Sequence, residues 1–227
     1  MNTSWAGQLA GFLRILRDTG LTHLPGTQKT PLEDLLQEVE SCTNCRLAKT
    51  VTNKVFGQGP IPSLVMLVGE GPGREEDMTG LPFVGRSGQL LDRILAAVEL
   101  TRQDVYIGNV IKCRPPNNRN PLPDEMEHCM PFIRKQIDLV GPKFVVTMGA
   151  VAARSILGIQ GALHSMRGKF YLVDGRYYMV TYHPAALLRN ERYKRPAWED
   201  WKMLRAAMNR YKADGTLPVA DKINILI

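Results

Sequence analysis

The stretch LVMLVGEGPGREED, residues 64–77, decides the fold class that this sequence predicts. Its leading run of five apolar residues is typical of a strand that is buried on both faces of a parallel sheet. A glycine-rich turn and four charged residues follow directly. Because ligands bind outside the carboxyl ends of parallel strands, this turn is the first candidate for a functional site.

Further apolar runs alternate with helical patterns along the rest of the chain. The predicted strands are 64–68, 105–110, 144–148 and 177–182, and the predicted helices lie near 86–98, 123–139, 150–157 and 196–211. Asp174-Gly175, between alternating apolar residues, predicts that the last strand is one arm of a hairpin. We therefore expect an α/β fold, a three-layer α/β/α sandwich around a four-stranded parallel sheet with helices on both faces.

The glycine-rich turn does not match the common phosphate-binding loops. A dinucleotide fingerprint needs G-x-G-x-x-G, a P-loop needs a lysine followed by serine or threonine, and neither pattern is present. Glu75, Glu76 and Asp77 would also place negative charge beside a phosphate. The turn offers instead the carboxylate of Glu70, which suits holding a water or countering a cation. A helix cap or an arginine partner is the structural alternative for the same carboxylate.

Polar residues also follow the other predicted strands. Asn109 ends the second strand and precedes KCRPP, and His183-Pro184 follows the fourth. The carboxyl ends of parallel strands meet at one edge of the sheet, so we expect these residues to converge there.

The length of 227 residues suits one domain with a short appendage. Residues 1–30 carry apolar residues at helical spacing, which predicts an N-terminal helical extension before a domain at 31–227. Within the extension, QLAGF resembles a sliding-clamp-binding peptide, although a packing stripe is the better interpretation. No apolar stretch approaches the length of a membrane span and no secretory leader is visible, so we expect a soluble, cytoplasmic monomer.

The formal charge of +7 and the pI near 9.3 favour a polyanionic partner. The segment RNERYKR, residues 189–195, holds four cations and one anion, and two more arginines lie in the loop 114–122. A solvated surface is the alternative interpretation of each group. In the reducing compartment expected here, the four cysteines are better read as metal ligands or buried apolar residues than as disulfides.

Four sequence blocks taken together resemble the iron-sulfur uracil-DNA glycosylases, the family 4 branch of the uracil-DNA glycosylase superfamily. The blocks are GEGPGREED, LPFVGRSGQLLD, NVIKCRPPNNRNPLPDE and TYHPAALLR, and the resemblance runs from about residue 33 to residue 211. It implies a monofunctional enzyme that flips uracil out of single- or double-stranded DNA and hydrolyses its N-glycosidic bond. The abasic site that remains would start base excision repair, in association with the nucleoid.

The resemblance also implies roles for the residues at the strand ends. Phe83 would stack on the extruded base, and Asn109 would read the uracil edge, where a side-chain amide matches the N3-H donor and O4 acceptor. His183 would donate a hydrogen bond to uracil O2 as negative charge develops there. Glu70 would hold the attacking water, helped by the backbone of Gly71. The structural alternatives are a core phenylalanine, a turn asparagine and a helix-capping histidine.

Further contacts follow from the same resemblance. Glu76 would supply the wall that blocks the methyl group of thymine, because the residue that does so in better-known branches is replaced here by Gly73. Leu187, four residues after His183, would fill the gap left by the flipped base. The cations expected to contact DNA are Arg114, Arg119 and Arg189.

Four cysteines match the ligands of the family's [4Fe-4S] cluster: Cys42, Cys45, Cys113 and Cys129. Four thiolates complete the ligand shell of such a cluster, and zinc would accept the same four, so only the resemblance chooses iron. The expected role of the cluster is to staple the N-terminal segment to the loop 114–122.

Two rival functions remain. Some relatives become covalently trapped on uracil-DNA, but they carry a basic insertion ending in histidine after the second strand, where this chain has CRPPNNRNPLPDE. A zinc-stapled nucleotide-binding module without catalysis is the other rival, and it leaves Phe83, Asn109 and His183 without a common purpose.

Overall fold

A computed structural model describes residues 30–223. The predicted N-terminal helical extension and its QLAGF peptide lie outside the described residues, apart from Thr30, which caps the first described helix.

The centre of the molecule is a six-stranded sheet in the order β2-β1-β3-β5-β4-β6. The strands are β1 (Val65–Gly69), β2 (Val105–Asn109), β3 (Phe144–Met148), β4 (Phe170–Val173), β5 (Arg176–Thr181) and β6 (Ala220–Lys222). The four predicted strands are present and run parallel, as β2, β1, β3 and β5.

The prediction of a four-stranded parallel sheet is nevertheless wrong. The predicted hairpin arm β4 pairs antiparallel with β5 and so adds a fifth strand to the same sheet. β6 then pairs parallel with β4. Asp221 and Lys222 of this strand are exposed, and Ala220 is partly buried. The sheet is therefore mixed, and β6 lacks the apolar pattern by which a sequence marks a strand.

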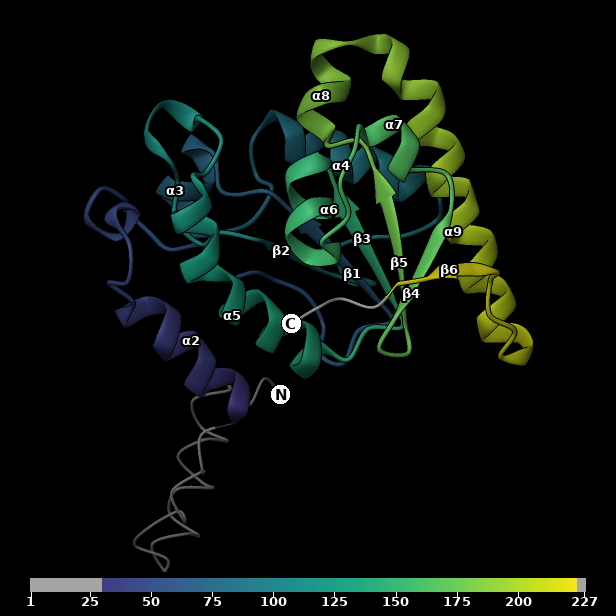
Figure 1. The fold of residues 1–227 in the computed structure, drawn as a ribbon, viewed down its shortest axis with the longest axis horizontal. Coiled ribbons are helices and arrows are strands. Elements are labelled where there is room, and N and C mark those ends of the chain that lie inside the picture. The colour runs from purple at the N-terminus through teal and green to yellow at the C-terminus, as the bar shows by residue number, and fades with distance from the viewer. Residues whose placement is uncertain (1–29, 224–227) are drawn as a thin grey trace, which may run out of the picture.

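Helices lie on both sides of the sheet (Figure 1). They are α2 (Pro31–Ser41), α3 (Arg74–Thr79), α4 (Arg86–Ala97), α5 (Pro123–Val140), α6 (Ala150–Leu157), α7 (Leu163–Met166), α8 (Pro184–Arg189) and α9 (Lys194–Asp214), with short 3-10 turns at Arg46–Lys49, Pro116–Asn118 and Glu191–Tyr193. The four helices predicted from the sequence correspond to α4, α5, α6 and α9.

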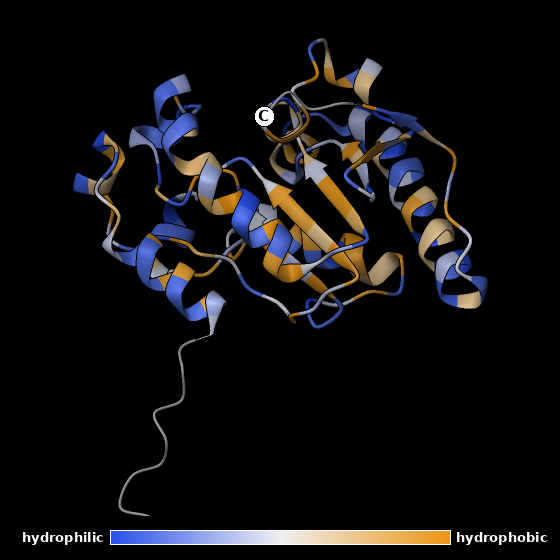
Figure 2. Ribbon diagram, turned by 60° about the horizontal axis from the view of Figure 1, so that its bottom comes forward, coloured by the Kyte–Doolittle hydropathy of each residue, from blue (hydrophilic) through white to orange (hydrophobic). Residues whose placement is uncertain are grey.

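Two apolar cores fill the layers on either side of the sheet. Ile133 of α5 and Ala153 of α6 pack with Met66 and Val145 on one face. Leu91 of α4 and Trp201 of α9 belong to the core on the other face. Figure 2 shows the central strands as the most hydrophobic part of the ribbon, as expected for strands covered on both faces. The sandwich architecture is thus as predicted.

The parallel strands place their carboxyl ends at one edge of the sheet. Gly69 at the end of β1 lies in register with Asn109 at the end of β2, and β5 leads directly to His183, the N-cap of α8. Pro184 occupies the first turn of α8, where a missing N–H costs nothing. No helix in residues 30–223 combines the length and apolar character needed to cross a membrane.

Candidate active site

A cavity of about 400 Å³ opens at the carboxyl edge of the sheet. It is lined by most of the residues predicted to contact uracil or DNA: Glu70, Gly71, Glu76, Phe83, Asn109, Arg119, His183 and Arg189. Leu187 and Arg114 are not part of the lining. Segments far apart in the chain therefore meet in one place, as the convergence of strand ends predicts.

Asn109 presents an unused hydrogen-bond acceptor. The residue is 1% exposed, and its side-chain Oδ1 has no hydrogen-bond partner among the described residues. A buried polar atom left unpaired costs about 1–3 kcal/mol, so such atoms are normally satisfied. A Cβ on Gly69 would lie only 2.4 Å from this oxygen, so the glycine keeps the space around the amide free. The acceptor is available for a ligand.

The imidazole of His183 is a neutral donor. Its Nδ1 accepts a hydrogen bond from the backbone N–H of Ala185 at 3.1 Å, which leaves the proton of a neutral ring on Nε2. Burial and, to a lesser extent, the positive charge of Arg189 together lower the pKa of His183 to about 4. Nδ1 caps the helix, and Nε2 is the ring nitrogen left for the donor role predicted from the sequence.

Phe83 is held in an unusual conformation beside this histidine. Its φ is 53°, in the left-handed region that non-glycine residues rarely adopt. The ring is 4% exposed and packs against the His183 ring, with centroids 5.5 Å apart. The ring therefore forms an aromatic wall of the cavity.

Glu76 connects the glycine-rich turn to the loop of Phe83. One carboxylate oxygen accepts hydrogen bonds from the N–H groups of Val84 and Gly85, at 2.9 and 3.0 Å. The other accepts from Gly73 at 3.1 Å. Glu76 lines the cavity, as a wall against a methyl group requires, but its polar atoms are already committed to the backbone.

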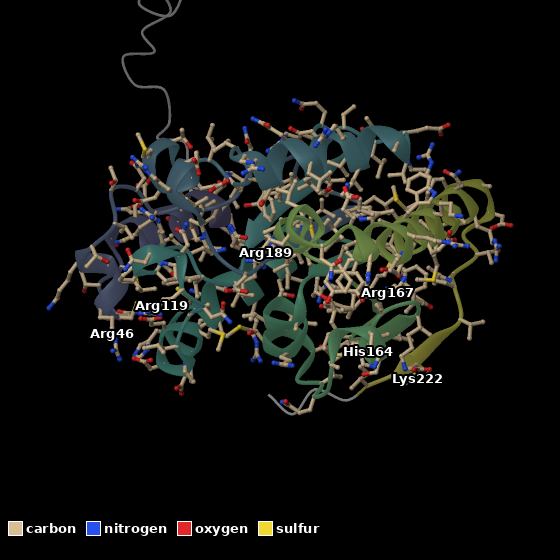
Figure 3. The ribbon with its side chains drawn as sticks, turned by 90° about the horizontal axis from the view of Figure 1, so that it is seen from above. Arg46, Arg119, His164, Arg167, Arg189 and Lys222 are labelled. Atoms are coloured by element: carbon tan, nitrogen blue, oxygen red, sulfur yellow. The ribbon has the colours of Figure 1, made fainter. Side chains whose placement is uncertain are left out.

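Glu70 is partly buried and lines the cavity. Burial raises the pKa of Glu70, and the nearby charge of Arg189 opposes that rise. The Glu70 carbonyl accepts a hydrogen bond from Ile111 at 3.1 Å, which fixes the backbone after β1. Arg189 is close enough to affect the pKa values of both Glu70 and His183. Figure 3 shows Arg189 separate from Arg119 when the molecule is viewed from above.

The structure does not present Leu187 to a ligand. Leu187 is 3% exposed and packs with Tyr182 and Ala197, whereas the next residue, Leu188, is 38% exposed. Ala185 and Arg189, four residues apart on α8, both line the cavity. At 100° per residue, Leu188 lies about 60° from Ala185 around the helix axis and Leu187 about 160° away. The motif spacing therefore selected the leucine that faces the interior.

The two loop arginines are engaged within the protein. Arg119 forms a two-armed ion pair with the buried carboxylate of Glu125, with N–O distances of 2.6 and 2.8 Å, and it holds the pKa of Glu125 below its usual range. Arg114 donates from Nε to Asn118 Oδ1 at 2.7 Å. Both side chains stabilise the loop between β2 and α5, whatever further contacts they make.

The four cysteines come from three parts of the chain and form no disulfide. Cys113 and Cys129 are buried, and Cys42 and Cys45 pack against the same core. Burial, together with smaller contributions from each of the other three cysteines, raises the pKa of Cys113 to about 12. Negative charge on these sulfurs is thus mutually unfavourable, and a bound cationic centre would relieve it. Within residues 30–223, no group of three or more Cys, His, Asp or Glu side chains is arranged so that it could hold a metal ion.

Several supporting residues have no motif in the sequence. The buried Lys112 donates to the backbone carbonyl of Asn109 at 2.8 Å and also to Gln136. Arg102 bonds the carbonyls of Pro82 and Phe83. The sequence gives one indication of the role of Lys112, which is its position inside the apolar run VIKC. A lysine that is buried there needs hydrogen-bond acceptors within the protein.

Comparison with known proteins identifies the class. Residues 56–203 match the family model described as the uracil DNA glycosylase superfamily. The chain belongs to this superfamily. It is 41% identical over 181 residues to the type-4 uracil-DNA glycosylase of Archaeoglobus fulgidus, covering 76% of this chain and 91% of that protein. It is 42% identical over 166 residues to the type-4 uracil-DNA glycosylase of Thermotoga maritima, covering 72% and 86%.

A third relative is more distant. The type-5 uracil-DNA glycosylase of Pyrobaculum aerophilum is 32% identical over 146 residues, covering 57% of this chain and 64% of that protein. Within the superfamily, the chain therefore belongs with the type-4 branch, as the four sequence blocks indicated.

Proposed function

We propose that this protein is a uracil-DNA glycosylase that hydrolyses the N-glycosidic bond of a flipped uracil and leaves an abasic site, the first step of base excision repair. The observation that carries the proposal is the unpaired Oδ1 of Asn109, buried in the same cavity as the neutral His183. The names of the type-4 relatives point to the same chemistry.

Asn109 supplies the selectivity for uracil over cytosine. Its Oδ1 can accept from uracil N3-H while its amide nitrogen donates to O4, so both groups are satisfied only by this base edge. Cytosine presents the reverse pattern and would leave buried polar groups unpaired, which strongly disfavours its binding. Phe83 adds stacking on the ring of the base, worth roughly 1–3 kcal/mol.

His183 stabilises the departing base. As the glycosidic bond breaks, negative charge develops on uracil and positive charge on the sugar. A neutral imidazole with its proton on Nε2 can donate a hydrogen bond to O2 without any prior change of its protonation state. A donor placed where charge develops is worth about 3–4 kcal/mol in known enzymes. Glu70 would accept a hydrogen bond from the attacking water and counter the positive charge on the sugar.

The edge around the cavity would bind the DNA. Arg189 is exposed at the end of α8 and suits contact with a phosphate. Leu188, rather than the buried Leu187, is the leucine of α8 that can enter the gap left by a flipped base. Arg114 and Arg119 would act mainly by shaping the loop beside the DNA. A sliding-clamp contact through residues 1–30, a monomeric state and association with the nucleoid stay predictions.

The four cysteines would hold a [4Fe-4S] cluster. Their proximity, and the cost of placing negative charge on them without a cation, fit such a group. Bound there, a cluster would supply structural cross-links between the segments that carry Cys42, Cys113 and Cys129. In this proposal it takes no part in breaking the glycosidic bond.

The test uses an end-labelled single-stranded oligonucleotide with one uracil and two denaturing gels. We expect strand cleavage only after alkali, with no protein band retained on the DNA, and loss of that cleavage in His183→Ala. A band that survives denaturation would instead indicate a covalently trapped protein. Uncleaved DNA with a folded wild-type protein would overturn the proposal.

A further inference from the structure

The side chain of Arg102 holds the backbone of the aromatic wall. Arg102 lies in the turn between α4 and β2. Its Nη1 donates to the carbonyl of Pro82 at 3.0 Å and its Nη2 to the carbonyl of Phe83. Its Nε donates to Asp92 on α4 at 2.7 Å. A planar guanidinium is suited to gripping two successive carbonyls in this way, because its donors point in fixed directions.

Phe83 requires such support because its conformation is strained. A non-glycine residue at φ 53° is energetically unfavourable and persists only where its surroundings impose it. Glu76 binds the two N–H groups that follow Phe83, and Arg102 binds its carbonyl. Helix α4 also contacts this peptide. A Cβ at Gly88 would lie only 1.7 Å from the backbone oxygen of Phe83, so the backbone of α4 packs closely against it.

The conformation decides where the ring points. With the backbone held in this way, the ring lies over Gly69 at the end of β1, where an added Cβ would come within 2.7 Å of Phe83 Cζ. It also lies against His183. A relaxed backbone at Phe83 would therefore move the ring away from the base-reading amide and from the histidine.

We propose that Arg102 is a positioning residue for base binding, acting through Phe83. The inference rests on the proposed function, because it assumes that Phe83 stacks on the base. Arg102 does not line the cavity, and its side chain is 29% exposed. Its effect on excision must therefore pass through the backbone that it holds.

The structure offers a matched control. Asp92→Asn removes the ion pair with Arg102 but leaves both carbonyl contacts, whereas Arg102→Met removes all three interactions. Arg102→Lys keeps a charge but lacks the fork that reaches two carbonyls. All three changes are at partly exposed positions, and melting temperatures identify any variant that is misfolded.

The experiment measures kcat and KM on single-stranded uracil-DNA, inhibition by free uracil, and the Kd for abasic DNA. We expect Arg102→Met to lower kcat/KM and to weaken free-uracil inhibition by roughly tenfold, the size of a charge-assisted hydrogen bond. Arg102→Lys should fall between it and wild type. Asp92→Asn should match wild type, and the Kd for abasic DNA should stay the same in all variants.

A double-mutant cycle with Phe83→Ala gives the decisive result. If Arg102 acts through Phe83, adding Arg102→Met to Phe83→Ala causes little further loss. If the losses in kcat/KM of the two single variants multiply in the double variant, the inference is overturned. It is also overturned if Arg102→Met has the same kinetics as Asp92→Asn. Wild-type protein without excision in the same assay would instead overturn the proposed function, so the two failures are distinguishable.

Discussion

The ring of Phe83 lies against the imidazole of His183, with centroids 5.5 Å apart and ring planes tilted by 34°. The two side chains come from distant parts of the chain, one from the loop before α4 and the other from the start of α8. Phe83, which would stack on the base, and His183, which would stabilise its departure, therefore fix each other's ring positions by direct packing. A variant of either residue should be examined for its effect on the other.

Replacing Asn109 by alanine is expected to lower excision without destabilising the fold. The lost Oδ1 makes no hydrogen bond within the described residues, so folding loses no bond with it. Removing its interaction with the base should lower kcat/KM roughly 5- to 150-fold, the equivalent of about 1–3 kcal/mol. Initial rates and melting temperatures of both proteins check this. Wild-type excision in the variant would remove Asn109 from base recognition.

Replacing Arg189 by glutamine should move the acid limb of the rate profile to higher pH. Burial raises the pKa of Glu70, and Arg189 opposes that rise, so the pKa increases further without the arginine. The pKa of His183 also increases, because the same charge lowers it. Activity that needs an ionised Glu70 and a neutral His183 is then lost at a higher pH.

Single-turnover rates at saturating enzyme measure this limb without interference from weaker binding. Arg192→Gln is the matched control, since it removes a cation of the same segment that affects neither Glu70 nor His183. If the profiles of the two variants coincide, Arg189 does not tune the site.

Leu188 and Leu187 should affect different properties when each is replaced by alanine. Leu188→Ala removes an exposed side chain and should lower excision from duplex DNA several-fold while leaving excision from single strands unchanged, because only the duplex must be opened. Leu187→Ala creates a cavity and should lower the free energy of unfolding by about 2–5 kcal/mol. Rates on both substrates, with urea denaturation, distinguish the two leucines. Equal losses on duplex and single strand would argue against Leu188 as the wedge.

Replacing Cys113 by serine should remove the visible absorption expected of an iron-sulfur cluster and lower the melting temperature. The buried thiol of Cys113 would be one of four cluster ligands, so its loss leaves the shell incomplete. Iron and zinc analysis of anaerobically purified protein identifies the metal. Met130→Leu, a change beside Cys129 that removes no thiol, should keep the colour. A colourless wild-type protein containing one zinc would contradict the cluster.

The sequence predicted the residues that line the cavity better than the residues that hold them in position. Glu70, Asn109 and His183 could be located because each follows an apolar run, and parallel strands bring such positions to one edge. Leu188 could not be chosen over Leu187, because the face that α8 buries depends on its packing against Tyr182 and Ala197. The role of Arg102 could not be predicted from the sequence. Its partners at the cavity wall are backbone carbonyls, which every residue type has.

The position of β1 inside the sheet has a consequence for how the protein is made. Val65 pairs with Val105, 40 positions further along the chain, and with Phe144, 79 positions further along. Pairing across such separations must close large loops first, so the sheet should assemble slowly compared with a helical bundle. Because His183 follows β5, a nascent chain has no complete cavity until that strand has left the ribosome. Glycosylase activity should therefore appear late in biosynthesis, and a fragment that ends before His183 should lack it.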